Sequence, residues 1–183
     1  MNKRFFLSVL TVLAITLFLF SSAWAQPRSD SKPPIITHSF AVEKGYLGYI
    51  WKIYIEAEDP DGDMYKIVST VDQPGWGRYF PDTILVKPHD RSHLKGYIQW
   101  NTFSSKTHYL REFTIITLKV SIFDKAGNES NVVVFPFEFV SRGVPKYQLP
   151  SPFNEGDKRL GYVHIDLYEP TFSGFVGRWE PRN

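Results

Sequence analysis

The chain has no cysteine among its 183 residues and no long run of basic residues. The absence of cysteine excludes a disulfide scaffold, a thiol nucleophile, an iron–sulfur cluster and a zinc site with cysteine ligands. Phosphate recognition depends on clustered Lys and Arg, so the missing basic run argues against nucleic acid as the main partner. Beyond residue 25 the sequence contains no apolar segment of bilayer-spanning length.

Residues 1–25 have the three parts of a secretory signal peptide. Lys3 and Arg4 give a positive start, residues 5–20 are uncharged and mostly apolar, and small residues precede a cleavage site before Gln26. A retained anchor is the alternative, but a spanning helix needs ~20 residues. Without Lys3 and Arg4 the 21 basic residues become 19, equal to the 19 acidic ones. We therefore expect a formally neutral protein, secreted to the periplasm, the cell exterior or the cell surface.

Period-two alternation of apolar residues predicts strands from residue 35 onwards, after a polar linker at residues 26–34. In residues 49–58 every odd position is apolar, and a turn of Asp, Pro and Gly follows at residues 59–62. Tyr65, Ile67 and Val71 are expected to face inward on the next strand. Later strands are predicted at residues 83–87, 96–101, 113–124 and 132–139.

Pro136 lies inside the last of these strands. Because proline cannot donate to a ladder, this strand is expected at a sheet edge or at a bulge. No pattern for a helix longer than two turns is present. About seven strands over residues 35–141 predict an all-β fold, an antiparallel β-sandwich of ~100 residues.

Four segments then suggest a family. They are the turn at residues 59–63 (DPDGD), residues 74–76 (PGW), residues 96–100 (GYIQW) and residues 120–130 (VSIFDKAGNES). In this order they resemble the immunoglobulin-like and cadherin-like domains of exported bacterial proteins. That resemblance implies an immunoglobulin-like sandwich and a role in interaction, spacing or adhesion without catalysis, and some such domains bind calcium.

Residues 142–183 form a C-terminal extension that the resemblance does not explain. The extension has five prolines and five glycines, yet it also has seven aromatic residues, too many for a solvated linker. Residues 162–168 alternate between apolar and polar residues and predict one extra strand. This strand could pack on its own sandwich and cover an edge, or it could add to the sheet of another protein.

A protein partner is expected to bind this extension. The residues assigned to that contact are Tyr162, Val163, Ile165, Leu167, Tyr168, Phe172, Phe175 and Trp179.

Acidic residues are densest between residues 56 and 63. Calcium takes six to eight oxygen ligands, and alternating Asp residues in a turn supply several of them. The spacing does not fit an EF-hand, because Gly62 is at position four of the loop and Thr70 is at position twelve. The alternative is a turn whose Asp and Gly serve backbone geometry. The candidate calcium ligands are Glu58, Asp59, Asp61, Asp63 and Asp124.

The sequence also contains an aromatic loop residue and a pair of histidines that are candidates for binding sites. Trp76 lies in a Pro-Gly-Trp-Gly loop and is a candidate for stacking on a carbohydrate, although loop aromatics also cap cores. His89 and His93 are four residues apart but follow Pro88 without helical periodicity, which favours surface loop histidines over a metal pair. No nucleophile elbow, phosphate loop or dinucleotide fingerprint is present, and we expect no enzymatic activity.

The sequence thus predicts an exported, non-enzymatic interaction or structural subunit of an extracytoplasmic or cell-surface assembly. The C-terminal extension would contact the partner. The alternative is a calcium- or carbohydrate-binding module.

Overall fold

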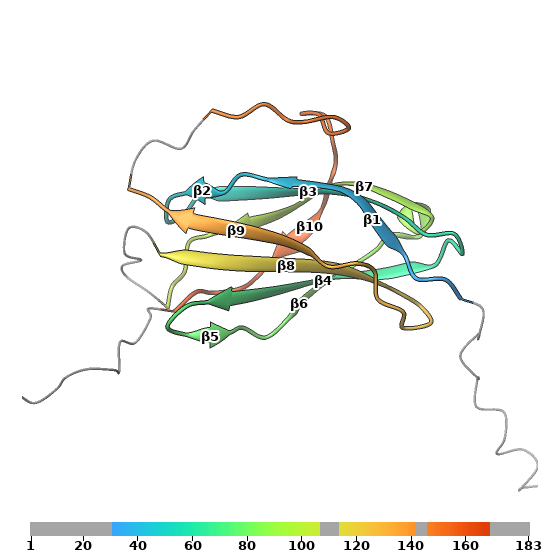
Figure 1. The fold of residues 1–183 in the computed structure, drawn as a ribbon, viewed down its shortest axis with the longest axis horizontal. Helices are drawn as coiled ribbons and strands as arrows, with labels where there is room; N and C mark the ends of the chain where they lie inside the picture. The colour runs from blue at the N-terminus through green and yellow to red at the C-terminus, as the bar shows by residue number, and fades with distance from the viewer. Residues whose placement is uncertain (1–30, 107–113, 142–145, 169–183) are drawn as a thin grey trace, which may run out of the picture. The chain divides into compact units, whose positions relative to one another are not determined.

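The computed structural model describes residues 31–106, 114–141 and 146–168, which form two packed β-sheets (Figure 1). Sheet A has the strand order β1 (Ile35–Ala41), β3 (Ile50–Glu58), β7 (His93–Asn101) and β10 (Arg159–Val163). Sheet B has the order β2 (Lys44–Gly45), β9 (Val133–Phe139), β8 (Ile115–Asp124), β4 (Met64–Gln73) and β5 (Gly77–Arg78), with β6 (Asp82–Leu85) also paired to β4. Within the described ranges the helical structure is one 3-10 turn, η1 (Pro88–Asp90).

The predicted all-β, immunoglobulin-like sandwich is confirmed. Strands β1, β3 and β7 share one sheet while β4, β8 and β9 share the other, which is the strand division of immunoglobulin-like domains. The sheets are not purely antiparallel as predicted, because β2 runs parallel to β9 and β10 runs parallel to β7. The chain passes from β1 in sheet A to β2 in sheet B, and the C-terminal extension supplies β10.

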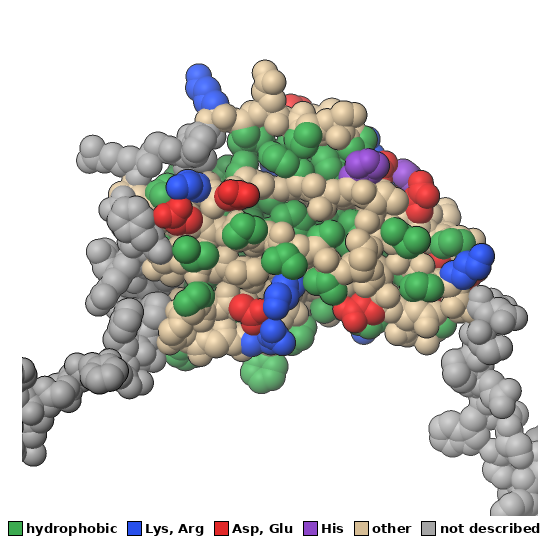
Figure 2. All heavy atoms as spheres, in the orientation of Figure 1, with side chains coloured by type: hydrophobic (Ala, Val, Ile, Leu, Met, Phe, Trp, Pro, Cys, Tyr) green, Lys and Arg blue, Asp and Glu red, His purple; other side chains and the backbone are tan. Residues whose placement is uncertain are grey.

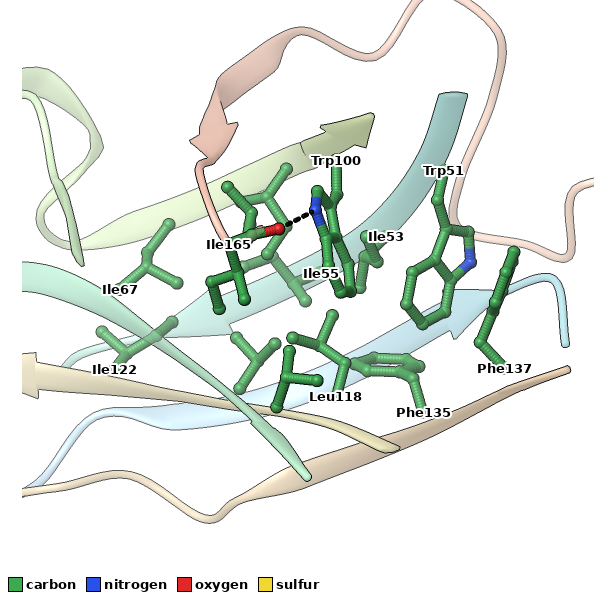
Figure 3. Packing of buried hydrophobic residues seen from close by; sticks show 14 of the residues in the cluster. Trp51, Ile53, Ile55, Ile67, Trp100, Leu118, Ile122, Phe135, Phe137 and Ile165 are labelled. Carbon is green, nitrogen blue, oxygen red and sulfur yellow. Dashed lines mark hydrogen bonds between the residues drawn. The ribbon is translucent and has the colours of Figure 1, made fainter. Parts of the chain in front are cut away.

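Alternating side chains from both sheets fill the core (Figure 3). The predicted alternation holds in β3, where Trp51, Ile53 and Ile55 are fully buried, and in β8, where Ile116 to Ile122 are buried at every second position. The prediction for Tyr65 is wrong, because a β-bulge between Met64 and Lys66 shifts the register and turns Met64 inward instead.

Pro136 lies on an open strand edge, as predicted. The Glu138 N–H donates outward to the carbonyl oxygen of Glu43, the residue before β2, at 2.8 Å, and the Phe139 N–H donates inward to Thr114 O, at 2.8 Å. Backbone N–H groups point alternately to the two sides of a strand, so position 136 also points outward. Strand β2 pairs only with Glu138 and Phe139, so this position has no β2 residue opposite it. The missing proline N–H removes no bond from the β8–β9 ladder.

Residues 146–168 of the extension pack onto the sandwich. Phe153 covers Tyr54 on the outer face of β3, with the ring centroids 5.5 Å apart. The chain then enters sheet A as β10 beside β7. This close approach requires glycine at position 96, because a Cβ there would collide with Lys158 O. The regular strand spans Arg159–Val163 and not the predicted residues 162–168.

Candidate functional sites: the anchored extension and the acidic end

Three buried side chains of the sandwich hold the main chain of the extension after β10 ends. Trp100 Nε1 donates to Ile165 O at 3.1 Å, a bond drawn in Figure 3, and Ser104 Oγ donates to Leu167 O at 2.6 Å. Gln73 Nε2 donates to Tyr168 O at 2.9 Å. Because these bonds reach carbonyl oxygens, they fix an extended backbone irrespective of its side chains.

Tyr168 is fixed at the point where the described chain ends. Its N–H donates to the Tyr79 hydroxyl at 2.8 Å, and that hydroxyl donates to Gln73 Oε1. Burial raises the pKa of Tyr79 to about 12, so the phenol stays protonated at neutral pH. The Tyr168 ring stacks on Trp76 with the centroids 4.4 Å apart and an interplanar angle of 8°. Tyr79, Gln73 and Trp76 thus form an anchor for Tyr168.

The residues predicted to contact a partner divide into three groups. Val163, Ile165 and Leu167 are buried between the sheets of their own sandwich. Tyr162 is exposed, with the Arg159 guanidinium 4.2 Å from its ring centroid. Tyr168 is partly buried in its anchor, and Phe172, Phe175 and Trp179 lie outside the described residues. Of the two alternatives for this strand, the structure shows packing on its own sandwich, and a partner contact stays a prediction.

Sequence reasoning missed Gln73, Tyr79 and Ser104 as anchoring residues. Gln73 carried a signal, because it continues the inward alternation of Ile67 and Val71 and is a polar residue at a core position. A buried amide needs hydrogen-bond partners, so it points to a main chain that packs against it.

Two turns build the acidic end of the sandwich. Asp59 is buried after β3, and its carboxylate oxygens accept the N–H groups of Asp61 and Asp63, each at 3.0 Å. Asp124 ends β8 and accepts the N–H and the Nδ2 of Asn128, both at 2.7 Å. These bonds match the alternative in which Asp shapes the turn.

The two turns are in contact, and Asp63 lies between them. The Lys125 N–H donates to Asp63 O at 3.2 Å. Asp63 Oδ1 is buried and has no hydrogen-bond partner in the described part of the chain. Burial raises the pKa of the Asp63 carboxyl, and the negative charges of Asp124, Asp59 and Asp61 raise it further.

Glu58 stands apart from this group. Its exposed carboxylate is 3.9 Å from His93 Nδ1 on β7. In residues 31–106, 114–141 and 146–168 no set of three or more His, Asp and Glu side chains has the arrangement of a metal site. Calcium binding by Asp59, Asp61, Asp63 and Asp124 therefore stays a prediction.

The remaining candidates occupy separate places. Trp76 is 43% exposed, and one ring face is stacked against Tyr168, so carbohydrate binding also stays a prediction. His89 pairs with Asp90 at 3.3 Å, whereas His93 lies 3.5 Å from Glu56, whose other oxygen is 3.1 Å from His38. The two rings beside Glu56 contact different oxygens of one carboxylate. Cross-strand register creates this arrangement, and the sequence carried no signal for it.

Figure 2 shows one face of the molecule, on which small groups of acidic and basic side chains lie beside each other between apolar ones. Among the described ion pairs, Asp72 lies 2.7 Å from Arg78 Nε and 2.8 Å from Lys119 Nζ. In the part of the chain that the structure describes, no helix is long and apolar enough to cross a membrane.

No family model matches the sequence, and no curated protein matches it. Among solved structures, the chain is similar to the PKD domain of an M14-like peptidase from Thermoplasmatales archaeon SCGC AB-540-F20, with 16% sequence identity and a TM-score of 0.39. The similarity covers 61% of this chain and 99% of that domain. The immunoglobulin-like assignment rests on the strand order of the chain itself.

Proposed function

We propose that this chain is an exported, non-enzymatic interaction or structural subunit of an extracytoplasmic or cell-surface assembly. The observation that supports this role is the anchoring of Tyr168 by Gln73, Tyr79 and Trp76. The anchor fixes the point from which residues 169–183 continue, and that segment contains three large aromatic residues. A rigid sandwich that ends in an aromatic segment suits recognition of a protein partner.

Burial reduces the set of residues that are available to contact a partner. Val163, Ile165 and Leu167 are buried in the core of their own sandwich. The remaining candidates for the partner contact are Tyr162, Phe172, Phe175 and Trp179. Aromatic residues carry much of the binding energy at protein interfaces, and each of these residues should matter individually.

Affinity purification from the native host tests this role. The full chain is compared with a chain that ends after Tyr168, which keeps every anchoring contact and removes the three aromatics. A second variant replaces Phe172, Phe175 and Trp179 by Ala. A stoichiometric protein that is captured by the full chain and lost from both variants is the expected result. Capture that is equal in all three, or no companion for the full chain, contradicts the proposal.

A calcium site at the acidic end is the second candidate, favoured by the unpartnered Asp63 Oδ1 among three further carboxylates. Burial raises the Asp63 pKa and the neighbouring carboxylates raise it further, and a divalent cation would neutralise the repulsion among these carboxylates. Millimolar CaCl₂ should then raise the melting temperature of the full chain and should leave Asp63→Asn unchanged, with MgCl₂ as the control salt. No calcium-specific rise would remove this candidate.

A further inference from the structure

The sheet edges of the sandwich are protected to different degrees. An exposed strand edge presents unpaired N–H and C=O groups and invites pairing with another chain. The β10 edge of sheet A is covered by β6, since Gly161 packs against Ile84 and the His164 N–H donates to Asp82 Oδ2 at 2.6 Å. On sheet B, strands β5 and β6 have two and four residues, and short edge strands limit pairing.

The β9 edge is protected in two ways. Strand β2 pairs with Glu138 and Phe139, and Pro136 removes the outward donor in the stretch before them. Proline on an edge is a common obstacle to further strand addition.

The β1 edge has no such protection over half of its length. The Asn131 side chain caps Ile36 alone, accepting its N–H at 2.8 Å and donating to its carbonyl at 3.1 Å. The backbone N–H and C=O of Ile36 therefore point away from β3. Because of the bulge before His38, the same alternation also points the backbone N–H and C=O groups of Ser39 and Ala41 away from β3. No described strand pairs with this side of β1, and residues 37–41 contain neither Lys nor Pro.

An apolar hollow adjoins the open edge. It has a volume of about 300 Å³ and is lined by Phe40, Ala41, Val42, Glu43, Lys44 and Tyr147. At the other end of the same strand, Ile35 exposes 52% of its surface. One strand thus carries an exposed apolar side chain before its midpoint and an apolar hollow after it.

We propose that β1 is a dimer interface, occupied by β1 of a second copy of this chain in antiparallel orientation about a two-fold axis at Ser39. An isologous interface must be self-complementary, and this strand meets that condition. Antiparallel pairing about Ser39 places Ile35 of each copy opposite Val42 and Glu43 of the other, where the hollow lies. The four strands of sheet A then continue into the four strands of the second copy. This interface is independent of the C-terminal partner contact.

Sedimentation velocity of the chain from Gln26 to Asn183, over a range from low micromolar to near millimolar, tests the dimer. We expect a reversible dimer. Ser39→Pro removes an outward N–H while leaving the β1–β3 ladder intact, and it should weaken dimerisation by roughly tenfold or more. Val134→Pro makes the same change at an outward position of the β9 edge and should leave dimerisation unchanged. A chain that is monomeric throughout, or a dimer that Ser39→Pro does not weaken, overturns the proposal.

A disulfide test is independent of the stability of Ser39→Pro. The chain has no cysteine, so Ser39→Cys introduces a single thiol. Directly opposed residues in an antiparallel hydrogen-bonded pair have Cα atoms ~5.5 Å apart, within the range that a disulfide spans. Mild oxidation should give a covalent dimer with Ser39→Cys and none with Thr83→Cys, an exposed position on β6. Equal cross-linking of both variants, or none for Ser39→Cys, also overturns the proposal.

Discussion

Asp72 shows how single residues set the pH response of the sandwich. On the outer face of sheet B, its carboxylate accepts a hydrogen bond from Arg78 Nε at 2.7 Å and lies 2.8 Å from Lys119 Nζ. The hydrogen bond from Arg78, followed by that from Lys119, lowers the pKa of Asp72 from 3.8 to about 2. A carboxyl with a lowered pKa in the folded state stabilises the protein above its unfolded pKa, and this stabilisation is lost as the pH falls towards the folded pKa.

Asp72→Asn should therefore remove part of the acid sensitivity between pH 3.8 and about 2. At neutral pH we expect a loss of about 1 kcal/mol in the free energy of unfolding, since solvent screens a partly exposed pair. Below pH 2, where Asp72 becomes protonated in the folded state as well, the stabilities of the variant and the parent chain should converge. Urea unfolding at both pH values measures the difference. An unchanged slope of stability with pH would show that the cluster contributes nothing.

The anchoring side chains show a second residue-scale principle, which is the cost of an unpaired buried polar group. Ser104 is 1% exposed, and its hydroxyl donates to Leu167 O. Ser104→Ala would leave that buried carbonyl without this donor, and we expect a loss of about 1–3 kcal/mol in unfolding free energy. Urea titration measures it, with Ser105→Ala, at an exposed neighbouring position, as the control. Equal stability of both variants would contradict the anchor.

At the scale of elements, long alternating segments were predictable and short ones were not. Strands β3, β8 and β9 begin within two residues of their predicted starts, because apolar residues recur at every second position over seven residues or more. Strands β2 and β5 have two residues each and leave no periodic signal. In the extension, the alternating pattern correctly predicted that Val163, Ile165 and Leu167 face inward. Strand pairing ends at Val163, however, and beyond it hydrogen bonds from anchoring side chains hold the backbone in place.

The extension should behave as a core element in mutagenesis. Leu167 is 1% exposed, and Leu167→Ala removes buried methyl groups and leaves a cavity. The expected loss of unfolding free energy is about 2–5 kcal/mol. Tyr162 lies five residues earlier, and its side chain is exposed. Tyr162→Ala should therefore lower the free energy of unfolding by less than about 1 kcal/mol. Chemical denaturation separates the two, and a small effect at Leu167 would mean that the segment is not part of the cooperative unit.

At the scale of the whole molecule, pattern reasoning identified the sandwich but not which distant residues meet. The candidate calcium ligands joined Asp124 to the turn at residues 59–63, but the contact between the two turns depends on the register of β4 against β8. The anchor at Tyr168 combines residues from β4, from the segment after β5 and from the C-terminal extension. Such contacts depend on tertiary packing, which one sequence without its fold does not specify.

The extent of the folding unit gives the last prediction. The strand pattern predicted a sandwich that ends at Ser141, whereas sheet A includes β10. A chain that stops at Ser141 loses the buried side chains of Phe153, Val163, Ile165 and Leu167. Each contributes about 1.5–3 kcal/mol by burial. That total is comparable with the 5–15 kcal/mol by which a domain is typically stable.

We therefore expect the chain that ends at Tyr168 to unfold cooperatively, with a melting temperature close to that of the full chain. The chain that ends at Ser141 should lack a cooperative transition, because Trp100, Ser104 and Gln73 would also lose their carbonyl acceptors. Circular dichroism melts of the three chains test this. If the Ser141 chain melts like the other two, residues 146–168 are an accessory to a sandwich that is complete without them. A partner that is lost on deleting them would then bind that segment directly.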